Sequence, residues 1–315
     1  MRAVVHERYG PPEVLRVEDV SEPELEHGCV LVRVHATTVT RSDAHMRAAH
    51  PWPSRLLTGL RRPKRPILGG EYAGVVDAVG PGVTEFRPGD RVFGHTGGFR
   101  AHAELVAVRE SSPIAHIPGE LPFEQAAACS DGPILTLNSL RTVELAGKRL
   151  LVYGASGSMG TAGVQLGKHL GAHVTAVTDT QHLELARELG ADVVLDRFAG
   201  DFTERGETWD VIFDAVGKLR FPRVRHALAP GGAYLPTDGF ANFVLALPTR
   251  WSDRRVRIAI PPRYLKEHVL LIQRLLERGE YRPVIDRTYR LEEIAEASRY
   301  VETGQKVGNV VLTVR

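Results

Sequence analysis

A glycine-rich turn between a short apolar run and an amphipathic stretch constrains this fold more than any other feature. The turn follows residues 148–153 (KRLLVY) and precedes a helix-periodic segment beginning near residue 158. Glycines at such a turn allow a tight bend and a close backbone approach to a pyrophosphate, and a helix N-terminus supplies unpaired N–H groups. We therefore expect a dinucleotide site here; a glycine-rich turn without a ligand is the alternative. The expected contacts are Gly154, Ser156, Gly157, Ser158, Met159 and Gly160.

The pattern of apolar residues changes near residue 122. Before it, short apolar runs are separated by Gly, Pro and Asp, which is typical of an antiparallel, partly barrel-like β region. After it, strands and helices alternate, which predicts βαβ units and a parallel sheet. The tail again resembles the first part. We predict an α/β protein with a β-rich domain at 1–122 and 262–315 and a doubly wound dinucleotide-binding domain at 123–261.

Asp179 lies about twenty residues beyond the turn, at the end of the next apolar strand. A carboxylate there would accept hydrogen bonds from ribose hydroxyls and repel a 2′-phosphate, which favours NADH. Arg197 follows the next strand, and a basic phosphate pocket that includes it would favour NADPH instead. A solvated turn residue is a third interpretation of Asp179. NAD(P)H is thus the expected cofactor, and NADH is preferred.

Composition excludes several classes of function. The 315 residues include 40 Lys and Arg against 38 Asp and Glu, a net charge of +2 that gives no strong field for nucleic acid or an anionic membrane. Two cysteines, Cys29 and Cys129, are too few for a disulfide framework and fit a reducing, cytoplasmic setting. The N-terminal residues do not resemble a leader, and no apolar run is long enough for a membrane span, so we expect neither export nor insertion.

Several stretches together resemble one family across nearly the whole chain. The chain is similar to the medium-chain dehydrogenases/reductases of the zinc-independent, quinone-oxidoreductase-like branch. The resemblance implies a GroES-like β-rich catalytic domain, a Rossmann domain, an active-site cleft and a homodimer. The stretches that carry it are MRAVVHERYGPPEVLRVEDV, GGEYAGVVDAVGPGVTEFRPGDRVFG, the turn at Gly154, FDAVG and YVETGQKVGNVVLTV.

The resemblance also bears on metal binding. Zinc enzymes of this superfamily have three ligands at positions that match Thr40, Gly70 and Gly132, none of which can replace the ligand. The four-cysteine structural lobe is absent as well. His95 and His102 are unremarkable among thirteen histidines, so we expect no catalytic metal.

Without a Lewis acid, an electron-poor acceptor is easier to reduce than a simple ketone, because its negative charge is delocalised. We expect hydride transfer to a small-molecule quinone or α,β-unsaturated carbonyl. A metal-free alcohol dehydrogenase or carbonyl reductase, and a non-catalytic dinucleotide-binding regulatory protein, are the alternatives.

The resemblance suggests proton donors and further cofactor contacts. Ser42 and His45 resemble a proton relay, with Thr40 and Tyr72 beside them; a turn serine, a surface histidine and a packing tyrosine are the competing interpretations. Asp43 is expected to fix the local turn. The further cofactor contacts implied are Arg41, Thr136, Val216, Gly217 and Asn309, of which Asn309 replaces a frequent lysine.

Two basic clusters have no assigned role. Arg61, Arg62, Lys64 and Arg65 lie within residues 52–66, where a solvated prolyl loop is favoured over a lid that attracts an anionic ligand. The basic residues at 250–257 are expected to flank an edge strand, where they discourage aggregation or border a dimer contact.

Overall fold

The computed structural model describes residues 1–50 and 55–314, apart from the side chains of residues 57 and 240. Residues 52–54 of the predicted basic segment lie outside this description. Contacts divide the chain into a first unit, Met1–Asp131 with Tyr264–Arg278 and Pro283–Arg315, and a second unit, Gly132–Arg263 with Gly279–Arg282. These units are defined by contacts between residues and do not test where a domain begins or ends. The domain limits of 1–122, 123–261 and 262–315 therefore stay a prediction.

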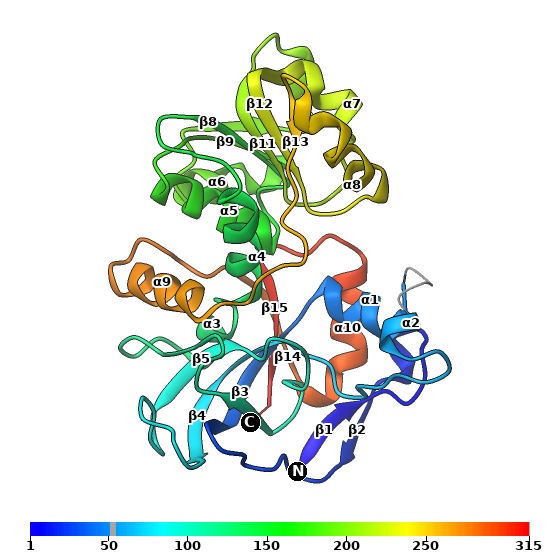
Figure 1. Ribbon diagram of the computed structural model, residues 1–315, viewed down its shortest axis with the longest axis vertical. Coiled ribbons are helices and arrows are strands. Elements are labelled where there is room, and N and C mark those ends of the chain that lie inside the picture. The colour runs from blue at the N-terminus through cyan, green and yellow to red at the C-terminus, as the bar shows by residue number, and fades with distance from the viewer. Residues whose placement is uncertain (51–54, 315) are drawn as a thin grey trace. The chain divides into compact units, whose positions relative to one another are not determined.

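The second unit is built on a parallel sheet. In the described residues its strand order is β10-β9-β8-β11-β12-β13, and every neighbouring pair is parallel. The helices α5 and α6 cover one side of this sheet and α7 the other (Figure 1). The strands are β8 (Arg149–Tyr153), β9 (His173–Thr178), β10 (Val193–Asp196), β11 (Trp209–Asp214), β12 (Leu228–Pro236) and β13 (Arg255–Val256). The helices are α4 (Asp131–Leu140, whose first residue belongs to the first unit), α5 (Ser158–His169), α6 (Leu183–Glu188), α7 (Phe221–Val224) and α8 (Phe240–Ala246).

Small residues let α5 lie close to the parallel sheet. A β-carbon built at Gly163 would be 3.1 Å from the ring of Phe213, and one at Gly167 would be 2.6 Å from Leu150. Buried apolar residues of β8, β11 and β12 fill the core behind them, among them Leu151 and Ile212. This packing fixes the N-terminus of α5 at the carboxyl end of β8.

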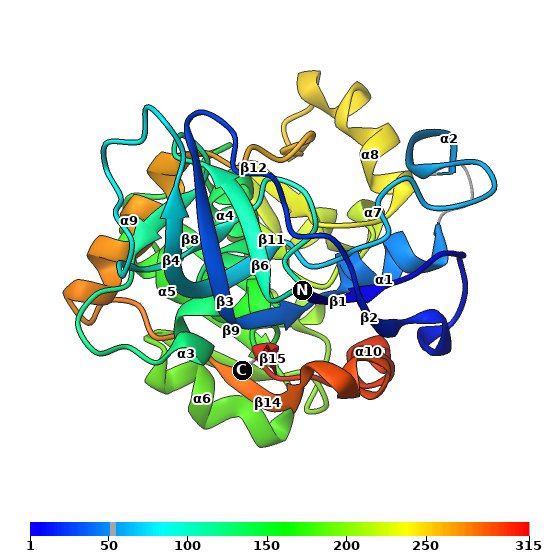
Figure 2. The same ribbon diagram turned by 90° about the horizontal axis from the view of Figure 1, so that it is seen from below.

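The first unit contains a mostly antiparallel sheet with the order β14-β15-β3-β4-β5-β7, in which β6 also pairs with β3. Figure 2 shows the long strand β3 from below. A separate pair, β1 and β2, is also antiparallel. The strands are β1 (Arg2–Val5), β2 (Arg16–Asp19), β3 (Cys29–Val39), β4 (Glu71–Val79), β5 (Arg91–His95), β6 (Leu105–Arg109), β7 (Ile114–His116), β14 (Ile285–Arg290) and β15 (Asn309–Thr313). The helices are α1 (Arg41–Ala48), α2 (Arg55–Thr58), α3 (Phe123–Ala127), α9 (Lys266–Glu277) and α10 (Ile294–Glu302).

The C-terminal segment returns to this first sheet, as its sequence pattern predicts. β15 pairs antiparallel with β3, with Val310 opposite Val39, and α10 contributes Ile294 and Val301 to the shared core. The alternating valines of β3 are buried in the same core. The predicted fold class, a GroES-like β-rich domain with a Rossmann-type parallel-sheet domain, is confirmed.

Candidate functional site

The glycine turn lies between β8 and α5, where the sequence predicts it. A β-carbon at Gly154, whose φ is +77°, would overlap the side chain of Val216, and one at Gly160 would overlap the carbonyl oxygen of Gly154. Gly157 differs, because a β-carbon there would meet nothing closer than that carbonyl oxygen, at 3.8 Å. Two glycines are therefore required by packing, whereas Gly157 leaves open space in front of the helix.

The open space at Gly157 is suited to an anion. Gly157 is the N-cap of α5, a helix of 12 residues, and its backbone is extended with a φ of −76°. The first turn of such a helix presents N–H groups and a positive dipole end to a phosphate. Ser156 and Ser158 are partly exposed beside it. The turn thus fits the pyrophosphate of a dinucleotide, and Met159 continues the first turn of the helix.

Asp179 and Arg197 form an ion pair at the carboxyl end of the parallel sheet. Both Nε and Nη2 of Arg197 face the Asp179 carboxylate, the latter at 3.2 Å from Oδ2. The guanidinium also stacks 4.4 Å from the centre of the Phe198 ring. Asp179, which favours NADH, and Arg197, which favours NADPH, are therefore paired with each other.

A buried carboxylate shapes the loop after β11. Oδ1 of Asp214 accepts hydrogen bonds from the backbone N–H groups of Val216 (3.2 Å) and Gly217 (2.9 Å). Its Oδ2 accepts from the Leu219 N–H at 2.8 Å and from the Tyr234 hydroxyl at 3.0 Å. Burial raises the pKa of Asp214. Sequence reasoning named Val216 and Gly217 but missed Asp214, although an acidic residue ending a parallel strand was a usable signal.

Thr136 has a packing role in this structure. It is fully buried in α4, and its hydroxyl donates to the carbonyl oxygen of Met159 at 3.2 Å. Gly132 is in the same helix, where a β-carbon would overlap the hydroxyl of Ser158. Both residues thus hold α4 against the start of α5.

In the first unit, Thr40 begins α1 as its N-cap. Its hydroxyl donates to Oδ2 of Asp43 at 2.7 Å and accepts from the Asp43 N–H at 3.2 Å, while Oδ1 of Asp43 accepts from the Gly69 N–H. This capping box stabilises the helix start. The hydroxyl of Thr40 is thereby engaged in local structure.

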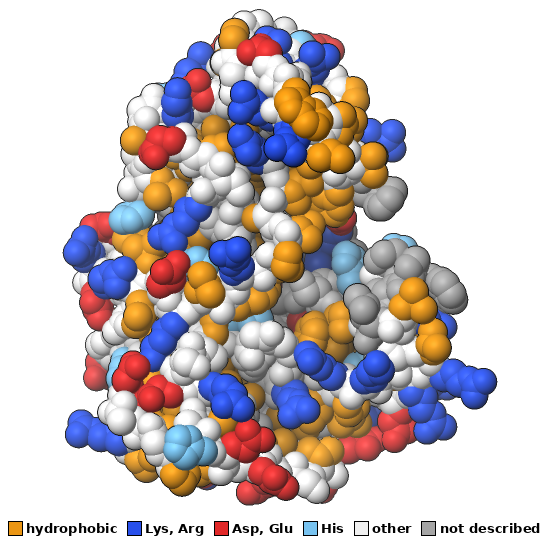
Figure 3. Space-filling view, in the orientation of Figure 1, with side chains coloured by type: hydrophobic (Ala, Val, Ile, Leu, Met, Phe, Trp, Pro, Cys, Tyr) orange, Lys and Arg blue, Asp and Glu red, His pale blue; other side chains and the backbone are white. Residues whose placement is uncertain are grey.

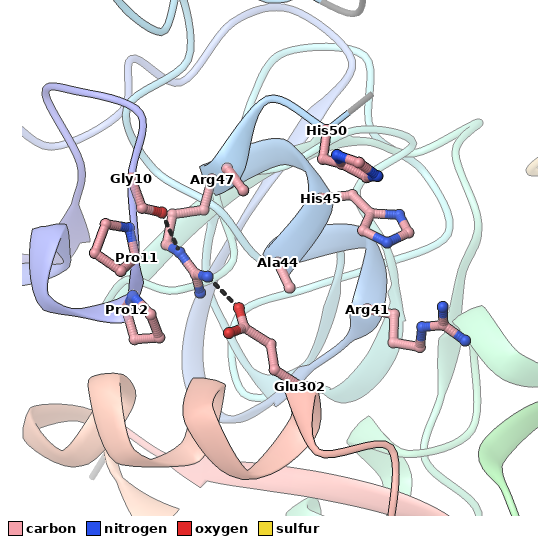
Figure 4. A pocket seen from close by; sticks show the side chains of 10 residues that line it. Gly10, Pro11, Pro12, Arg41, Ala44, His45, Arg47, His50 and Glu302 are labelled. Carbon is pink, nitrogen blue, oxygen red and sulfur yellow. Dashed lines mark hydrogen bonds and ion pairs between the residues drawn. The ribbon is translucent and has the colours of Figure 1, made fainter. Parts of the chain in front are cut away.

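A pocket of about 390 Å³ is located beside α1. In Figure 4, Arg41, His45 and His50 are on one side of it. Arg47, which is buried, donates to the carbonyl oxygen of Gly10 at 3.1 Å and pairs with Glu302. Ser42 is exposed on the same helix but does not line the pocket.

Tyr72 does not belong to an open site. Its side chain is 0% exposed within the core of the first unit, and its hydroxyl has no hydrogen-bond partner among the residues that the structure describes. Burial raises its pKa strongly. The structure therefore places Tyr72 as a packing aromatic of the core.

The preceding residue, Glu71, is the centre of a buried polar cluster that sequence reasoning missed. Its carboxylate accepts hydrogen bonds from the Thr38 hydroxyl, from the Ser130 hydroxyl at 3.0 Å, and from the Asp131 N–H at 2.6 Å. Burial raises the pKa of Glu71, and these hydrogen bonds oppose the rise. The Gly-Gly-Glu sequence at residues 69–71 was the available signal, but sequence reasoning interpreted it only as the ligand position at Gly70.

Asp131 continues the cluster. Its Oδ1 accepts from the Tyr264 hydroxyl at 2.8 Å and lies 3.5 Å from Nε2 of His95. Burial, followed by the nearby Glu71 carboxylate, raises the pKa of Asp131 to about 7. Burial lowers the pKa of His95 to about 3, so this imidazole is neutral. A buried acid that titrates near neutrality is a candidate for proton transfer.

The positions discussed for metal ligands are occupied by other contacts. A β-carbon at Gly70 would overlap Nε2 of His95, and one at Gly69 would overlap the ring of His102. In the part of the chain that the structure describes, no three His, Cys, Asp or Glu side chains gather as a metal site. The donor set around Thr40, Gly70 and Gly132 thus does not fit zinc.

Asn309 lies at the start of β15. Its backbone N–H and its side-chain amide both donate to the carbonyl oxygen of Val284, at 2.9 and 3.1 Å. Lys306, three residues earlier, is partly buried and donates to the Gly308 carbonyl oxygen at 2.5 Å. Burial lowers the pKa of Lys306 to about 8. Asn309 therefore anchors the start of β15 to Val284. The lysine that the family resemblance leads one to expect at position 309 has a counterpart three residues earlier, in Lys306.

Cys29 and Cys129 are free and buried. Arg61, Arg62, Lys64 and Arg65 are exposed. None of the helices in the described ranges is long and apolar enough to cross a membrane.

Two family models match the chain. Residues 26–118 match the alcohol dehydrogenase GroES-like domain, and residues 189–312 match the zinc-binding dehydrogenase model.

Curated relatives match over nearly the whole chain. The mitochondrial NAD(P)H oxidoreductase RTN4IP1 of Mus musculus is 30% identical, over all of this chain and 89% of that protein. A quinone oxidoreductase of Pseudomonas aeruginosa is 31% identical over 96% of this chain and 97% of its own length. The chloroplastic NADPH-dependent alkenal/one oxidoreductase of Arabidopsis thaliana is 29% identical, over 99% of this chain and 79% of its own.

A solved structure gives the same fold. The quinone oxidoreductase of Coxiella burnetii superposes with a TM-score of 0.90, covering all of this chain and 99% of the other, at 24% identity. That similarity concerns the fold alone.

Proposed function

Because the chain belongs to the medium-chain dehydrogenase/reductase family, in its quinone-oxidoreductase-like branch, we propose that it is an NAD(P)H-dependent reductase of quinones or α,β-unsaturated carbonyl compounds. The observation that carries this proposal is the glycine turn, which leaves space for a pyrophosphate at Gly157. The relatives from Pseudomonas aeruginosa and Arabidopsis thaliana, named for a quinone and for alkenals and enones, support the acceptor class.

Bound NAD(P)H would supply a hydride from C4 of its nicotinamide. The chain would position this cofactor through the turn at Gly157 and the loop that Asp214 holds. The described residues offer no Lewis acid ligand set for a simple ketone, and a conjugated acceptor needs none, because its charge spreads over the oxygen and the ring or double bond. We therefore propose a zinc-independent reaction.

NADH is our proposed preference between the two cofactors. The Asp179 carboxylate, at the end of β9, can accept hydrogen bonds from ribose hydroxyls. A 2′-phosphate would have to compete with that carboxylate for the guanidinium of Arg197. The pairing of Arg197 with Asp179 thus supports NADH. Loss of the Asp179 carboxylate would release Arg197 for a 2′-phosphate and shift the preference towards NADPH.

The proton donors named from the sequence are not equally placed. Ser42 and His45 are on α1 with at least partial exposure, whereas Thr40 is engaged by Asp43 and Tyr72 is enclosed in the core. We retain Ser42 and His45, with Arg41 near the cofactor, as candidates, and drop Tyr72.

We also propose a reducing, cytoplasmic setting, because Cys29 and Cys129 are both free.

We propose in addition that the protein forms a homodimer through its second unit. β13 is an edge strand, and apolar side chains gather on the surface over α8 and the segment that follows it (Figure 3). Val244, Leu247 and Trp251 are 57%, 64% and 75% exposed there. Burial of such a patch against a second copy would remove apolar surface from water. Sedimentation analysis that gives a monomer at all concentrations would reject the dimer.

The acceptor class can be tested with purified protein. Oxidation of NADH and of NADPH is followed at 340 nm with a quinone, a cyclic enone and the matching saturated ketone. We expect turnover of the quinone or the enone and little with the ketone. Turnover of the ketone alone would favour the carbonyl reductase alternative, and cofactor binding without any turnover would favour a regulatory protein.

A further inference from the structure

The segment that begins with α2 is the most basic part of the chain. Residues 55–66, which we call the basic loop, contain no Asp or Glu and five cationic residues: Arg55, Arg61, Arg62, Lys64 and Arg65. The whole chain has 40 Lys and Arg against 38 Asp and Glu, so the rest of it carries a small acidic excess. The net charge of +2 therefore conceals one local concentration of positive charge.

The four basic side chains after Gly59 are exposed and lack counter-charges. None of them forms an ion pair with a residue that the structure describes, whereas Arg299 of the same unit pairs with Glu13. Cations that are gathered without local partners repel one another, and an anionic surface relieves this repulsion. The four residues are Arg61, Arg62, Lys64 and Arg65.

Two leucines of the basic loop are exposed beside these cations. Leu56 on α2 and Leu60, just after α2, are 66% and 62% exposed. Figure 3 shows apolar and basic side chains next to one another over α2 and the loop that follows it. A single exposed leucine is common on protein surfaces, whereas two within one basic loop give that loop an apolar part and a cationic part.

A tight turn presents these side chains. The Lys64 N–H donates to the carbonyl oxygen of Thr58 at 2.8 Å, which closes the turn. Gly59 has a φ of +125°, and a β-carbon there would overlap the carbonyl oxygen of Arg62. Glycine is therefore required at this position, because other residues rarely adopt such a φ and would also collide with the turn.

Both ends of the basic loop are tied to the N-terminal segment. The Tyr9 hydroxyl donates to the carbonyl oxygen of Gly59 at 2.8 Å, and the His6 N–H donates to the carbonyl oxygen of Pro66 at 2.9 Å. Figures 1 and 2 both show α2 and the loop after it at the outer edge of the first unit. The leucines and cations are thus displayed together on an anchored turn.

We propose that the basic loop docks the protein on an anionic lipid surface. Leu56 and Leu60 enter the boundary between headgroups and acyl chains, and the four exposed cations lie among the headgroup phosphates and carboxylates. This contact is peripheral and spans nothing. It replaces the solvated loop that the sequence alone favours, and it does not depend on the proposed reductase activity.

The two kinds of side chain contribute in different ways to such binding. Each Lys or Arg close to an anionic leaflet strengthens binding about fivefold, which is about 1 kcal/mol. Leucines that leave water for the interface add the burial of apolar surface. Binding should therefore depend on both the lipid charge and the leucines.

The leucines favour a lipid surface over nucleic acid. A nucleic acid would engage the cations through its phosphates and would leave the aliphatic side chains of Leu56 and Leu60 in water. A bilayer offers phosphates and an apolar layer at adjacent depths, which matches the pairing of cations and leucines on this loop.

The test is co-sedimentation of the full chain with vesicles of phosphatidylcholine, either alone or with about 30% phosphatidylserine. We expect the wild type to bind the anionic vesicles at least about tenfold more tightly than the neutral ones, and to be released by about 0.5 M NaCl. Equal binding to both kinds of vesicle, or binding to neither, would overturn the proposal. Binding to poly(U) RNA without binding to vesicles would overturn it in favour of nucleic acid.

The double variant Arg61→Glu with Arg62→Glu tests the cations. Its affinity for anionic vesicles should fall at least about twentyfold. Arg220→Glu with Arg225→Glu is the matched control, because it makes the same change in net charge at two exposed arginines of the second unit. The control should stay within about threefold of the wild type. An equal loss in both double variants would show an effect of net charge alone and overturn the assignment to this loop.

The double variant Leu56→Ser with Leu60→Ser tests the apolar part. It keeps every charge, so a fall of at least about fivefold in affinity for anionic vesicles would come from lost apolar burial. Ile260→Ser is the control, because Ile260 is 62% exposed in the second unit. Urea unfolding should be unchanged in these variants, since all the substituted side chains are exposed. Unchanged affinity of the leucine variant would overturn docking on lipid.

Discussion

The imidazole of His95 fills the space beside the α-carbon of Gly70, where any β-carbon would overlap Nε2 of the ring. The contact joins β5 to the residue before β4 and makes glycine at position 70 a packing requirement. It also places His95 next to Glu71 and Asp131, so one small residue supports the buried polar cluster.

Gly70→Ala should therefore destabilise the protein. The added methyl group must displace His95 from its stack on Tyr264, and such overpacking costs about 1–3 kcal/mol. Urea unfolding measures this difference. Gly157→Ala is the control, because a β-carbon there has no close neighbour and its φ is negative. Equal stability of the Gly70 variant and the wild type would contradict the packing.

Gly157→Val should weaken cofactor binding without unfolding the chain. The side chain would enter the space in front of α5 that the pyrophosphate needs, so we expect Kd to rise at least about tenfold for NADH and NADPH, a loss of about 1.4 kcal/mol. Titration by intrinsic fluorescence measures Kd, and urea unfolding checks the fold. Unchanged affinity would remove Gly157 from the cofactor site.

Asp179→Ser should raise the ratio of kcat/KM for NADPH to that for NADH. The substitution removes the carboxylate and releases Arg197 for a 2′-phosphate. Because both side chains are partly exposed, we expect a change of about fivefold to tenfold, close to 1 kcal/mol. Glu184→Ser, which breaks the exposed pair with Arg187, is the control and should leave the ratio as it is. A constant ratio in the Asp179 variant would refute its contact with the ribose.

Removal of metal should not abolish activity. Thr40 is engaged by Asp43, and the other two expected ligand positions are glycines, so we expect no zinc at these three positions. After dialysis against a chelator, reductase activity should remain within about twofold. Loss of activity that added zinc restores would show that a metal is required.

His95→Phe should make folding less sensitive to acid. The pKa of His95 is lowered to about 3, so the folded state binds this proton more weakly than the unfolded state. Its contribution to stability is complete above pH 6.5 and is lost as pH falls towards 3. Between pH 6.5 and 4, the variant should gain up to about 3 kcal/mol relative to the wild type. Urea unfolding at several pH values measures this; a constant difference would contradict the burial of a neutral imidazole.

The sequence alone determined the architecture, because its signals are local. The turn at Gly154–Gly160, the alternation of strands and helices after residue 122 and the apolar pattern of the tail each depend on residues near one another in the chain. Hydrophobic period and backbone freedom at glycine act over such short ranges. The parallel sheet and the return of the tail to the first unit agree with these local signals, whereas the pairing of β15 with β3 was not predicted.

The candidate site depended on contacts between distant residues. Nothing local indicates that Tyr264 meets Asp131 across 133 positions, or that Arg197 turns back onto Asp179. Tyr72 was assigned to a cleft from the family resemblance. The structure shows that Glu71 and Tyr72 are consecutive buried residues of β4, so the strand pattern does not reveal which side chain enters a site. Only tertiary packing enclosed the Tyr72 hydroxyl in the apolar core and gave Glu71 its donors, since both outcomes are set by neighbours from other strands.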